Sequence, residues 1–352
     1  MKKMPSIFDY VNSRAIATYI ANNPSNNIPY LGAALFPASK KLGLDLSWIK
    51  GAHGVPVSLQ PSAFDTKATL RDRIGFSKIE TEMPFFRESM RLGEKDRQEL
   101  LRLQDNSNDQ YVMPLITQIF NDRAKLVAGA QVVPERMIMQ LLSSGHIRIT
   151  SAETRQHYDY NYGFADSHKE TLTGSARWSD PNSTPIQDIQ RWKKIINGDT
   201  GATITRAICT EKTWGYLMEH PAIRLDMNPI GGQNIIMTDE MLKAYLLNKL
   251  SIRVSVYNKI YGLQDGSKHQ FFPDDFFTLL PDGNLGTTWY GTTPEEADLM
   301  AGATSAEVSI VNTGVAITTI KEPHPVNVEA IVSEIVLPSF ETMDDIFIAK
   351  VA

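Results

Sequence analysis

The sequence predicts an α+β protein built from two or three folding units. Three patterns predict this class: a long helical periodicity over residues 94–144, a mixed α/β pattern over residues 178–320, and two apolar strand patterns at the C-terminal end. The length of 352 residues agrees with it, because domains average roughly 150 residues. A chain of this length buries a sizeable core without the help of a metal or a disulfide.

The composition excludes several classes of protein. Hydrophobic residues make up 42% of the chain and charged residues 21%, an ordinary globular balance that excludes a disordered chain. There are 35 Lys and Arg against 40 Asp and Glu, so the cationic surplus of a general nucleic-acid coat is absent. Cys209 is the only cysteine, which excludes an intrachain disulfide and a cysteine-based metal cluster.

Neither a signal peptide nor a membrane span is predicted. Polar residues interrupt the apolar ones between positions 7 and 20, and no window approaches the roughly eighteen apolar residues of a span. Together with the single cysteine, this predicts that the protein is made and used in a reducing, aqueous compartment.

The N-terminal segment, residues 1–47, has the pattern of an arm followed by a linker. Residues 6–20 predict a short amphipathic helix, and residues 22–27 form a polar run rich in turn residues. Residues 30–37 are apolar but too few to form a helix with its own core. We therefore expect them to lie on another surface.

Residues 48–90 predict a long two-stranded loop. Apolar and polar residues alternate over 55–59 and again over 74–79, as they do in half-buried strands. An isolated hairpin is marginally stable in water, so we expect this loop to rest on another surface, such as a neighbouring subunit. Its tip is charged, and its basic residues are Lys67, Arg71 and Arg73.

Residues 94–144 form the most helical stretch, because apolar residues recur there at intervals of three, four or eight. Pro134 lies deep inside this stretch, and we expect it to kink or interrupt the helix. Gly145 ends the helix, and the alternation over 146–150 predicts a strand directly after it. Aromatic and polar residues alternate over 158–164, which predicts the partner strand.

The mixed α/β region alternates strong helix and strand patterns. Its helices are predicted over 186–196, 211–219 and 238–250, and its strands over 203–210, 252–257 and 276–280. Two final strands are predicted over 330–337 and 346–351.

The sequence predicts no catalytic residue, no cofactor and no metal. It contains no phosphate-binding P-loop, no dinucleotide-binding glycine motif, no HExxH and no GxSxG, and its seven histidines lack metal-ligand spacing. Asp274 and Asp275 beside His269 are interpreted as a polar turn before a strand rather than a hydrolytic or metal site. Cys209 is interpreted as a packed thiol rather than a nucleophile.

Two further patterns have ordinary structural interpretations. The pair Gly231–Gly232 is interpreted as a loop turn rather than a phosphate-binding loop. Between Asp265 and Ala301 there are seven acidic residues and one basic residue, Lys268, which sum to −6. A run of this kind is usually a solvated face, and it would repel nucleic acid.

Three stretches of sequence resemble one known family. They are Trp178–Asp180 with the helix that begins near Ile186, Phe272–Asp275 with Gly286–Gly291, and the C-terminal stretch that ends in Asp344–Ala352. Arm, long loop, long helix, α/β region and final strands also follow the order of the major capsid proteins of tailed bacteriophages. On these grounds the chain resembles the lambda-type major capsid protein E family.

The resemblance implies a tailed-phage and herpesvirus-type major capsid fold and a structural, non-enzymatic role. It implies an icosahedral shell of pentamers and hexamers around a double-stranded DNA genome. The implied segments are an N-terminal arm (1–47), an extended loop (48–90), a peripheral domain with a spine helix (91–175 with 321–352) and an axial domain (176–320). The implied location is the virion capsid, after synthesis and assembly in the cytoplasm of the host bacterium.

The resemblance also implies partners. These are further copies of the chain, a separate scaffolding protein, a portal protein, a decoration protein as a further candidate, and packaged DNA bound without sequence specificity; no membrane is implied. We expect Lys67, Arg71 and Arg73 to pair with acidic residues of an adjacent subunit. Two alternatives stay open on sequence alone: an α/β enzyme with an unfamiliar active site, and another virion protein such as a tail-tube or decoration subunit.

Overall fold

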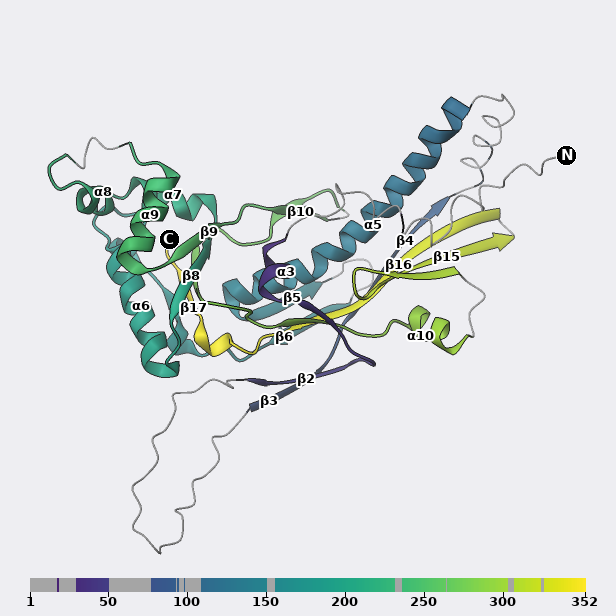
Figure 1. Cartoon of the computed structure of the whole chain (residues 1–352), viewed down its shortest axis with the longest axis horizontal. Helices are drawn as coiled ribbons and strands as arrows, with labels where there is room; N and C mark the ends of the chain where they lie inside the picture. Colours follow the sequence, from purple (N-terminus) through teal and green to yellow (C-terminus); the bar gives the residue numbers. More distant parts are fainter. Residues whose placement is uncertain are drawn as a thin grey trace, which may run out of the picture. The chain divides into compact units, whose positions relative to one another are not determined.

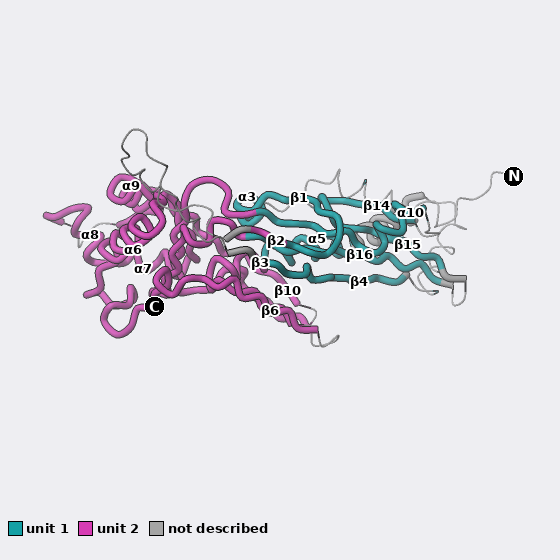
Figure 2. Tube along the Cα trace, turned by 90° about the horizontal axis from the view of Figure 1, so that it is seen from below, with its two compact units in different colours: residues 1–46, 80–136, 287–339 teal, residues 47–79, 137–286, 340–352 magenta. Residues whose placement is uncertain are grey.

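The chain folds into two compact units (Figure 2). This computed structural model describes residues 30–50, 77–92, 109–150, 156–231, 236–263, 265–302, 307–323 and 326–352, with the single positions 18, 94 and 98. Unit 1 comprises residues 1–46, 80–136 and 287–339, and unit 2 comprises residues 47–79, 137–286 and 340–352.

Unit 1 contains a six-stranded sheet whose central strand is β16 (Val326–Ser339). The strand order is β1-β13-β16-β15-β14, and β4 also pairs with β16. Since β15 and β4 pair with overlapping residues of β16, they lie on its opposite edges. The other strands are β1 (Ala38–Lys40), β4 (Phe85–Leu92), β13 (Thr287–Tyr290), β14 (Glu307–Val311) and β15 (Val315–Pro323).

The core of unit 1 joins this sheet to the long helix α5 (Asp109–Ser144; Figure 1 shows its course), of which the residues up to 136 belong to this unit. Leu126 and Val127 of α5 are buried in one cluster with Tyr290 and Val336 of the sheet. The packing is close: a Cβ added at Gly314 would lie 2.4 Å from the Cβ of Tyr290, so glycine is required there. The short helix α10 (Pro294–Ala301) also belongs to this unit.

Helix α5 differs from the prediction at Pro134. The helix runs unbroken from Asp109 to Ser144 and is not interrupted at that residue. A proline removes one backbone hydrogen bond, and here the burial of apolar neighbours such as Met137 and Ile138 outweighs that cost. Gly145, in the left-handed region at φ 72°, ends the helix as predicted.

The apolar residues 30–37 rest on α5, as expected. They form the short helix α3 (Leu31–Leu35), and Leu35 and Phe36 are buried. Glu135 of α5 accepts a hydrogen bond from the backbone N–H of Gly32 at 3.2 Å, which satisfies an N–H group at the start of α3.

Two hairpins lie at the positions of predicted strands. Strands β2 (Asp45–Lys50) and β3 (Ser77–Glu82) form a two-stranded sheet at the base of residues 48–90. The strand predicted over 55–59 and the helix predicted over 6–20, apart from the helical residue Thr18, lie outside the described residues. The strands predicted after α5 are confirmed as β5 (His146–Thr150) and β6 (His157–Asn161), which pair antiparallel.

Unit 2 is an α/β unit with a five-stranded sheet in the order β7-β17-β12-β8-β9. Its strands are β7 (Lys169–Thr171), β8 (Ile204–Cys209), β9 (Arg253–Val256), β12 (Phe276–Pro281) and β17 (Phe347–Lys350). A separate hairpin consists of β10 (Ile260–Gly262) and β11 (Lys268–Gln270). The helices are α6 (Pro185–Thr200), α7 (Glu211–Glu219), α8 (Pro221–Met227) and α9 (Asp239–Leu250), with 3-10 turns at 166–168, 174–176 and 343–345.

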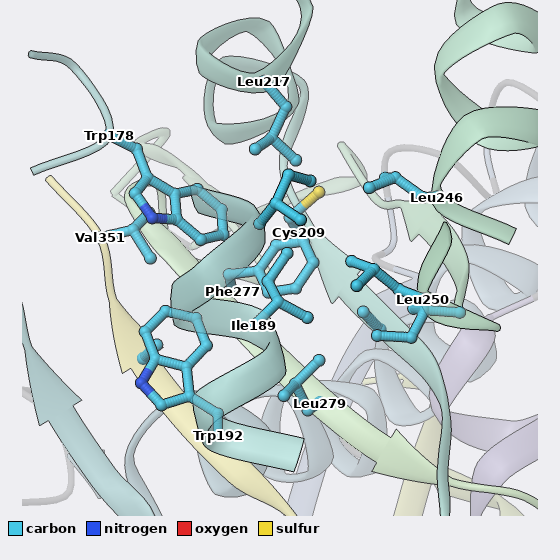
Figure 3. Close-up of a cluster of buried hydrophobic side chains, with 14 of the residues drawn as sticks. Trp178, Ile189, Trp192, Cys209, Leu217, Leu246, Leu250, Phe277, Leu279 and Val351 are labelled. Carbon is cyan, nitrogen blue, oxygen red and sulfur yellow. The ribbon is translucent and has the colours of Figure 1, made fainter. Parts of the chain in front are cut away.

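The helices and strands predicted for this region are confirmed as α6, α7, α9, β8, β9 and β12. Their apolar side chains form the core of unit 2. Trp178 and Trp192 stack with their ring centroids 5.8 Å apart, and Trp178 also packs on Phe277 (Figure 3). Cys209 lies inside this apolar cluster and is fully buried. The C-terminal strand β17 adds Phe347 to the same core. No helix among the described residues is both long and apolar enough to cross a membrane.

The compact units divide the chain at other positions than the predicted domains. Residues 287–320 group with unit 1, whereas residues 137–175 and 340–352 group with unit 2. Grouping by contacts does not test the functional names peripheral and axial, so those names stay predictions.

Candidate functional site

The predicted contact residues Lys67, Arg71 and Arg73 lie outside the described residues. Among the residues that the structure describes, several exposed apolar side chains lie close in sequence in unit 2, on α8, on α9 and in the segment between them. Five of the twelve large exposed hydrophobic residues belong to this region. We call them the α8–α9 surface: Leu225, Ile230, Ile236, Met241 and Leu247.

The isoleucines of this surface are the most exposed apolar residues described. Ile230 is 100% exposed and Ile236 is 87% exposed, so neither contributes to the core of the subunit. Single exposed apolar side chains are common, but several in one region are typical of an interaction surface. The α8–α9 surface is therefore the strongest candidate contact surface of the described residues.

Local sequence signals fix the helices that carry this surface. Helix α7 ends at Glu219, and Pro221 occupies the first position of α8, where its missing N–H costs nothing. The side chain of Asn228 accepts hydrogen bonds from the N–H groups of Ile230 and Gly231, which forms the turn after α8. This confirms the interpretation of Gly231 as part of a loop turn; Gly232 lies outside the described residues.

Helix α9 carries apolar residues both on its buried stripe and away from it. Leu242, Leu246 and Leu250 recur every four residues and are buried in the unit 2 core. Met241 and Leu247 lie off this stripe and are exposed. A helix that already has a buried face thus presents additional apolar residues to its surroundings.

Polar contacts hold α8 against α9. One carboxylate oxygen of Asp226 accepts hydrogen bonds from the hydroxyl group of Tyr245 and, at 2.9 Å, from the ammonium group of Lys249. Both bonds lower the pKa of Asp226, with the bond to Lys249 the larger cause. Trp214 of α7 donates to Asp239 at 3.0 Å. Figure 1 shows α7, α8 and α9 gathered together, which agrees with these contacts.

The acidic stretch from Asp265 to Ala301 is not one solvated face. The stretch is divided between the two units, and three of its carboxylates form ion pairs with Lys or Arg side chains. Asp275 pairs with Lys212, Glu295 with Arg87 at 2.5 Å, and the buried Glu296 with Lys40 at 2.5 Å. These pairs neutralise much of the charge that the sequence suggested.

The residues with superficial resemblance to catalytic groups have structural roles. Asp275 has a φ of 67° and lies in the turn directly before β12, which confirms the turn interpretation. Asp274 accepts a hydrogen bond from Thr210 at 2.6 Å. Burial raises the pKa of the Cys209 thiol far above its usual range, so Cys209 is a packed thiol, as interpreted. Among the described residues, no cluster of three His, Cys, Asp or Glu side chains is arranged to hold a metal.

Ser183 and His220 lie close enough together to resemble a catalytic nucleophile and its general base. The Oγ atom of Ser183 lies 2.9 Å from Nε2 of His220. Both residues are at most 4% exposed, and the Ser183 hydroxyl donates to the backbone carbonyl of Asp180 at 2.8 Å. The contact joins the turn before α6 to the residue that precedes α8.

Sequence reasoning did not identify the α8–α9 surface. The signal was present: Ile230 and Ile236 flank a glycine-rich turn between two predicted helices, and a turn does not bury isoleucine.

The fold is similar to that of known phage proteins. A phage-related protein from Bordetella bronchiseptica RB50 has 17% sequence identity and a TM-score of 0.53, with 97% of each chain covered. The putative capsid protein of a prophage of E. coli CFT073 has 14% identity and a TM-score of 0.60, with 97% of this chain and 99% of that chain covered. At these identities the similarity shows a shared fold. No curated protein sequence matches the chain.

The family described as phage major capsid protein E matches residues 12–351, almost the whole chain. This match agrees with the α+β architecture and with the capsid fold of the structural neighbours. It confirms the resemblance found in the sequence and gives the chain a structural, shell-forming role in the virion. The chain belongs to the phage major capsid protein E family.

Proposed function

We propose that this chain assembles through pentamers and hexamers into the icosahedral shell that encloses the double-stranded DNA of a tailed phage. The observation that carries the proposal is the α8–α9 surface, whose apolar residues gain burial only on a second molecule. Head-to-tail contacts between identical copies close into rings when the rotation between neighbours divides a full turn. Rings of five and six then tile a closed shell.

The segments have distinct roles in this proposal. Residues 1–47 act as an arm, 48–90 as the extended loop, 91–175 with 321–352 as the peripheral domain, and 176–320 as the axial domain. The α8–α9 surface belongs to the axial residues, which agrees with contacts between copies around a symmetry axis. Lys67, Arg71 and Arg73 of the extended loop pair with acidic residues of an adjacent subunit.

Several partners belong to the same proposal. A separate scaffolding protein guides assembly, a portal protein occupies one vertex, and a decoration protein is a further candidate partner. Assembly takes place in the cytoplasm of the host bacterium. The net charge of −5 over 352 residues supports a wall to which packaged DNA does not adhere strongly, because strong adhesion requires a cationic surface.

A charge placed on the α8–α9 surface tests the proposal. In the double variant Ile230→Asp with Ile236→Asp, we expect the subunit to fold normally, with a change of about 0.5 kcal/mol or less, because both side chains are exposed. Shell formation should be lost, since two carboxylates would be desolvated at every contact. Negative-stain microscopy measures the shells, and circular dichroism measures folding.

The matched control is Ile260→Asp, an isoleucine of the β10–β11 hairpin that is 56% exposed and lies in the same unit. We expect this variant to form shells. Normal shells from the double variant would remove the α8–α9 surface from the proposal, and stable small oligomers from the wild-type chain with a scaffold would contradict the shell itself.

A further inference from the structure

His220 lies between two structural elements of unit 2 and contacts both. It precedes α8 as its N-cap residue, and it faces the turn that leads into α6. The residue is 2% exposed, so water does not replace the bonds that its ring makes. The ring therefore has to satisfy both nitrogen atoms inside the protein.

The two hydrogen bonds of the ring assign its protonation state. Nδ1 accepts a hydrogen bond from the backbone N–H of Ala222 at 3.3 Å, so Nδ1 carries no proton. Nε2 lies 2.9 Å from Ser183 Oγ, whose own proton goes to the carbonyl of Asp180. Nε2 is therefore the donor, and the ring is neutral with its proton on Nε2.

We propose that His220 is a pH-sensitive cap: its neutral ring holds the N-terminus of α8, and protonation of Nδ1 on acidification releases that end of the helix. An imidazolium ring has two N–H donors and no acceptor. The N–H of Ala222 would then face a donor, which breaks the cap and places a positive charge at the positive end of a helix.

The electrostatic surroundings agree with this geometry. Burial is the larger influence and lowers the pKa of His220, while the carbonyl and the charge of Asp180 raise it. Arg224, one turn further along α8, directs its guanidinium Nε to the carbonyl of Met218 at 3.2 Å. The ring therefore binds a proton less readily while it caps α8 than it does after its release to solvent.

The sign of the pH effect follows. An exposed histidine binds a proton near pH 6.5, whereas the capped ring binds it only at lower pH. Between these two pH values, the state in which α8 is released takes up a proton that the capped state does not. Release of the end of α8 therefore becomes more favourable as the pH falls. Since α8 carries Leu225 and leads to Ile230, acid loosens the support of the α8–α9 surface.

Hydrogen exchange of the full-length chain, held as free subunits, tests the proposal without any assembly step. Between about pH 7.5 and pH 5.5, after correction for intrinsic exchange, the opening constant of the α8 amides should rise by up to about tenfold. The variant His220→Asn keeps a capping oxygen but does not titrate, so its α8 amides should show no such rise. His269→Asn, at an exposed position on β11, should behave as the wild type.

A second measurement does not depend on how the variant folds. Nitrogen NMR of the wild-type ring should show the proton on Nε2 at neutral pH. A proton on Nδ1, an α8 that is indifferent to pH, or an equal rise in His220→Asn would each overturn the proposal. Because these readouts concern the free subunit, they remain informative even if the proposed shell contacts are wrong.

Discussion

The most unusual single residue of unit 1 is Glu334, a carboxylic acid in the centre of β16. It is 1% exposed, and among the described residues neither carboxyl oxygen has a hydrogen-bond partner. Burial raises its pKa well above the usual value. The residue is therefore held in its neutral form, at a cost that an apolar side chain would avoid.

Replacing Glu334 with methionine should stabilise the protein at neutral pH. In the unfolded chain the carboxyl group loses its proton near pH 4.5, while in the folded chain it keeps the proton to higher pH. Wild-type stability therefore falls as the pH rises through this interval. We expect Glu334→Met to gain about 1–3 kcal/mol at pH 7.5 and less near pH 4.5, measured by denaturant unfolding.

The control for this prediction is Glu329→Met in the same strand. Glu329 pairs with Arg91 at 3.2 Å, and hydrogen bonds from Ser89 and Arg91 lower its pKa. This substitution should therefore give no gain in stability at pH 7.5. A Glu334→Met protein less stable than the wild type at that pH would contradict the argument.

Individual residues were predicted well where burial follows directly from sequence. Cys209 lies in an apolar strand pattern, and the structure buries it completely. Glu334 was not recognised, because a glutamate within an alternating strand normally points to solvent. The dual bonding of His220 was also beyond prediction, since Ser183 lies 37 positions away and only the fold brings the two together.

At the scale of elements, Trp48 anchors strand β2 and thereby its pairing with β3. Its ring lies 5.2 Å from that of Tyr162, between ring centroids, and both residues are buried. We expect Trp48→Ala to reduce the free energy of unfolding by about 3–5 kcal/mol, because it leaves a large cavity beside Tyr162.

The companion variant Trp48→Phe should cost much less. Phenylalanine keeps an aromatic ring on Tyr162 and removes an indole N–H that has no partner among the described residues. Thermal unfolding of both variants measures the difference. Equal losses for alanine and phenylalanine would show that the contact with Tyr162 contributes little.

Helices and strands with a strong hydrophobic periodicity were predictable, and the exceptions have physical reasons. The helices that became α6, α7 and α9 have clear start signals: Thr238, for example, accepts a hydrogen bond from the N–H of Met241. The interruption that was one of the two outcomes expected at Pro134 does not occur, because packing in a folded protein outweighs one missing hydrogen bond.

At the scale of the whole molecule, the order of elements and the class of fold were predictable, and the grouping into units was not. Strand β1 pairs with β13 through Ala38 and Thr288, which lie 250 positions apart. Periodicity reports the local environment of a segment and carries no information on such distant partners. The family resemblance supplied the class of fold and the order of the elements, but not these pairings.

The proposed contact of the extended loop is a prediction about the assembled particle. Reversing charge with Arg71→Glu and Arg73→Glu should reduce the yield of shells while the subunit remains folded. Each exposed ion pair contributes only about 0–1 kcal/mol, but the same contact recurs at every subunit. Particle yield after sedimentation, with microscopy of the fractions, measures the effect.

The control carries the same change of charge at exposed positions outside the loop, Arg253→Glu with Lys268→Glu. This control should form shells at the wild-type yield. If the loop variant does so as well, the two arginines are not subunit contacts.

The burial of Cys209 has a practical consequence. Because it is the only cysteine of the chain and is fully enclosed, the native subunit presents no thiol to its surroundings. A cysteine introduced at an exposed position, such as Ala297 on α10, would then be the single site at which a maleimide dye, peptide or drug attaches. A shell built from such subunits would carry one reactive thiol per subunit, so the number of attached molecules could be calculated from the number of subunits.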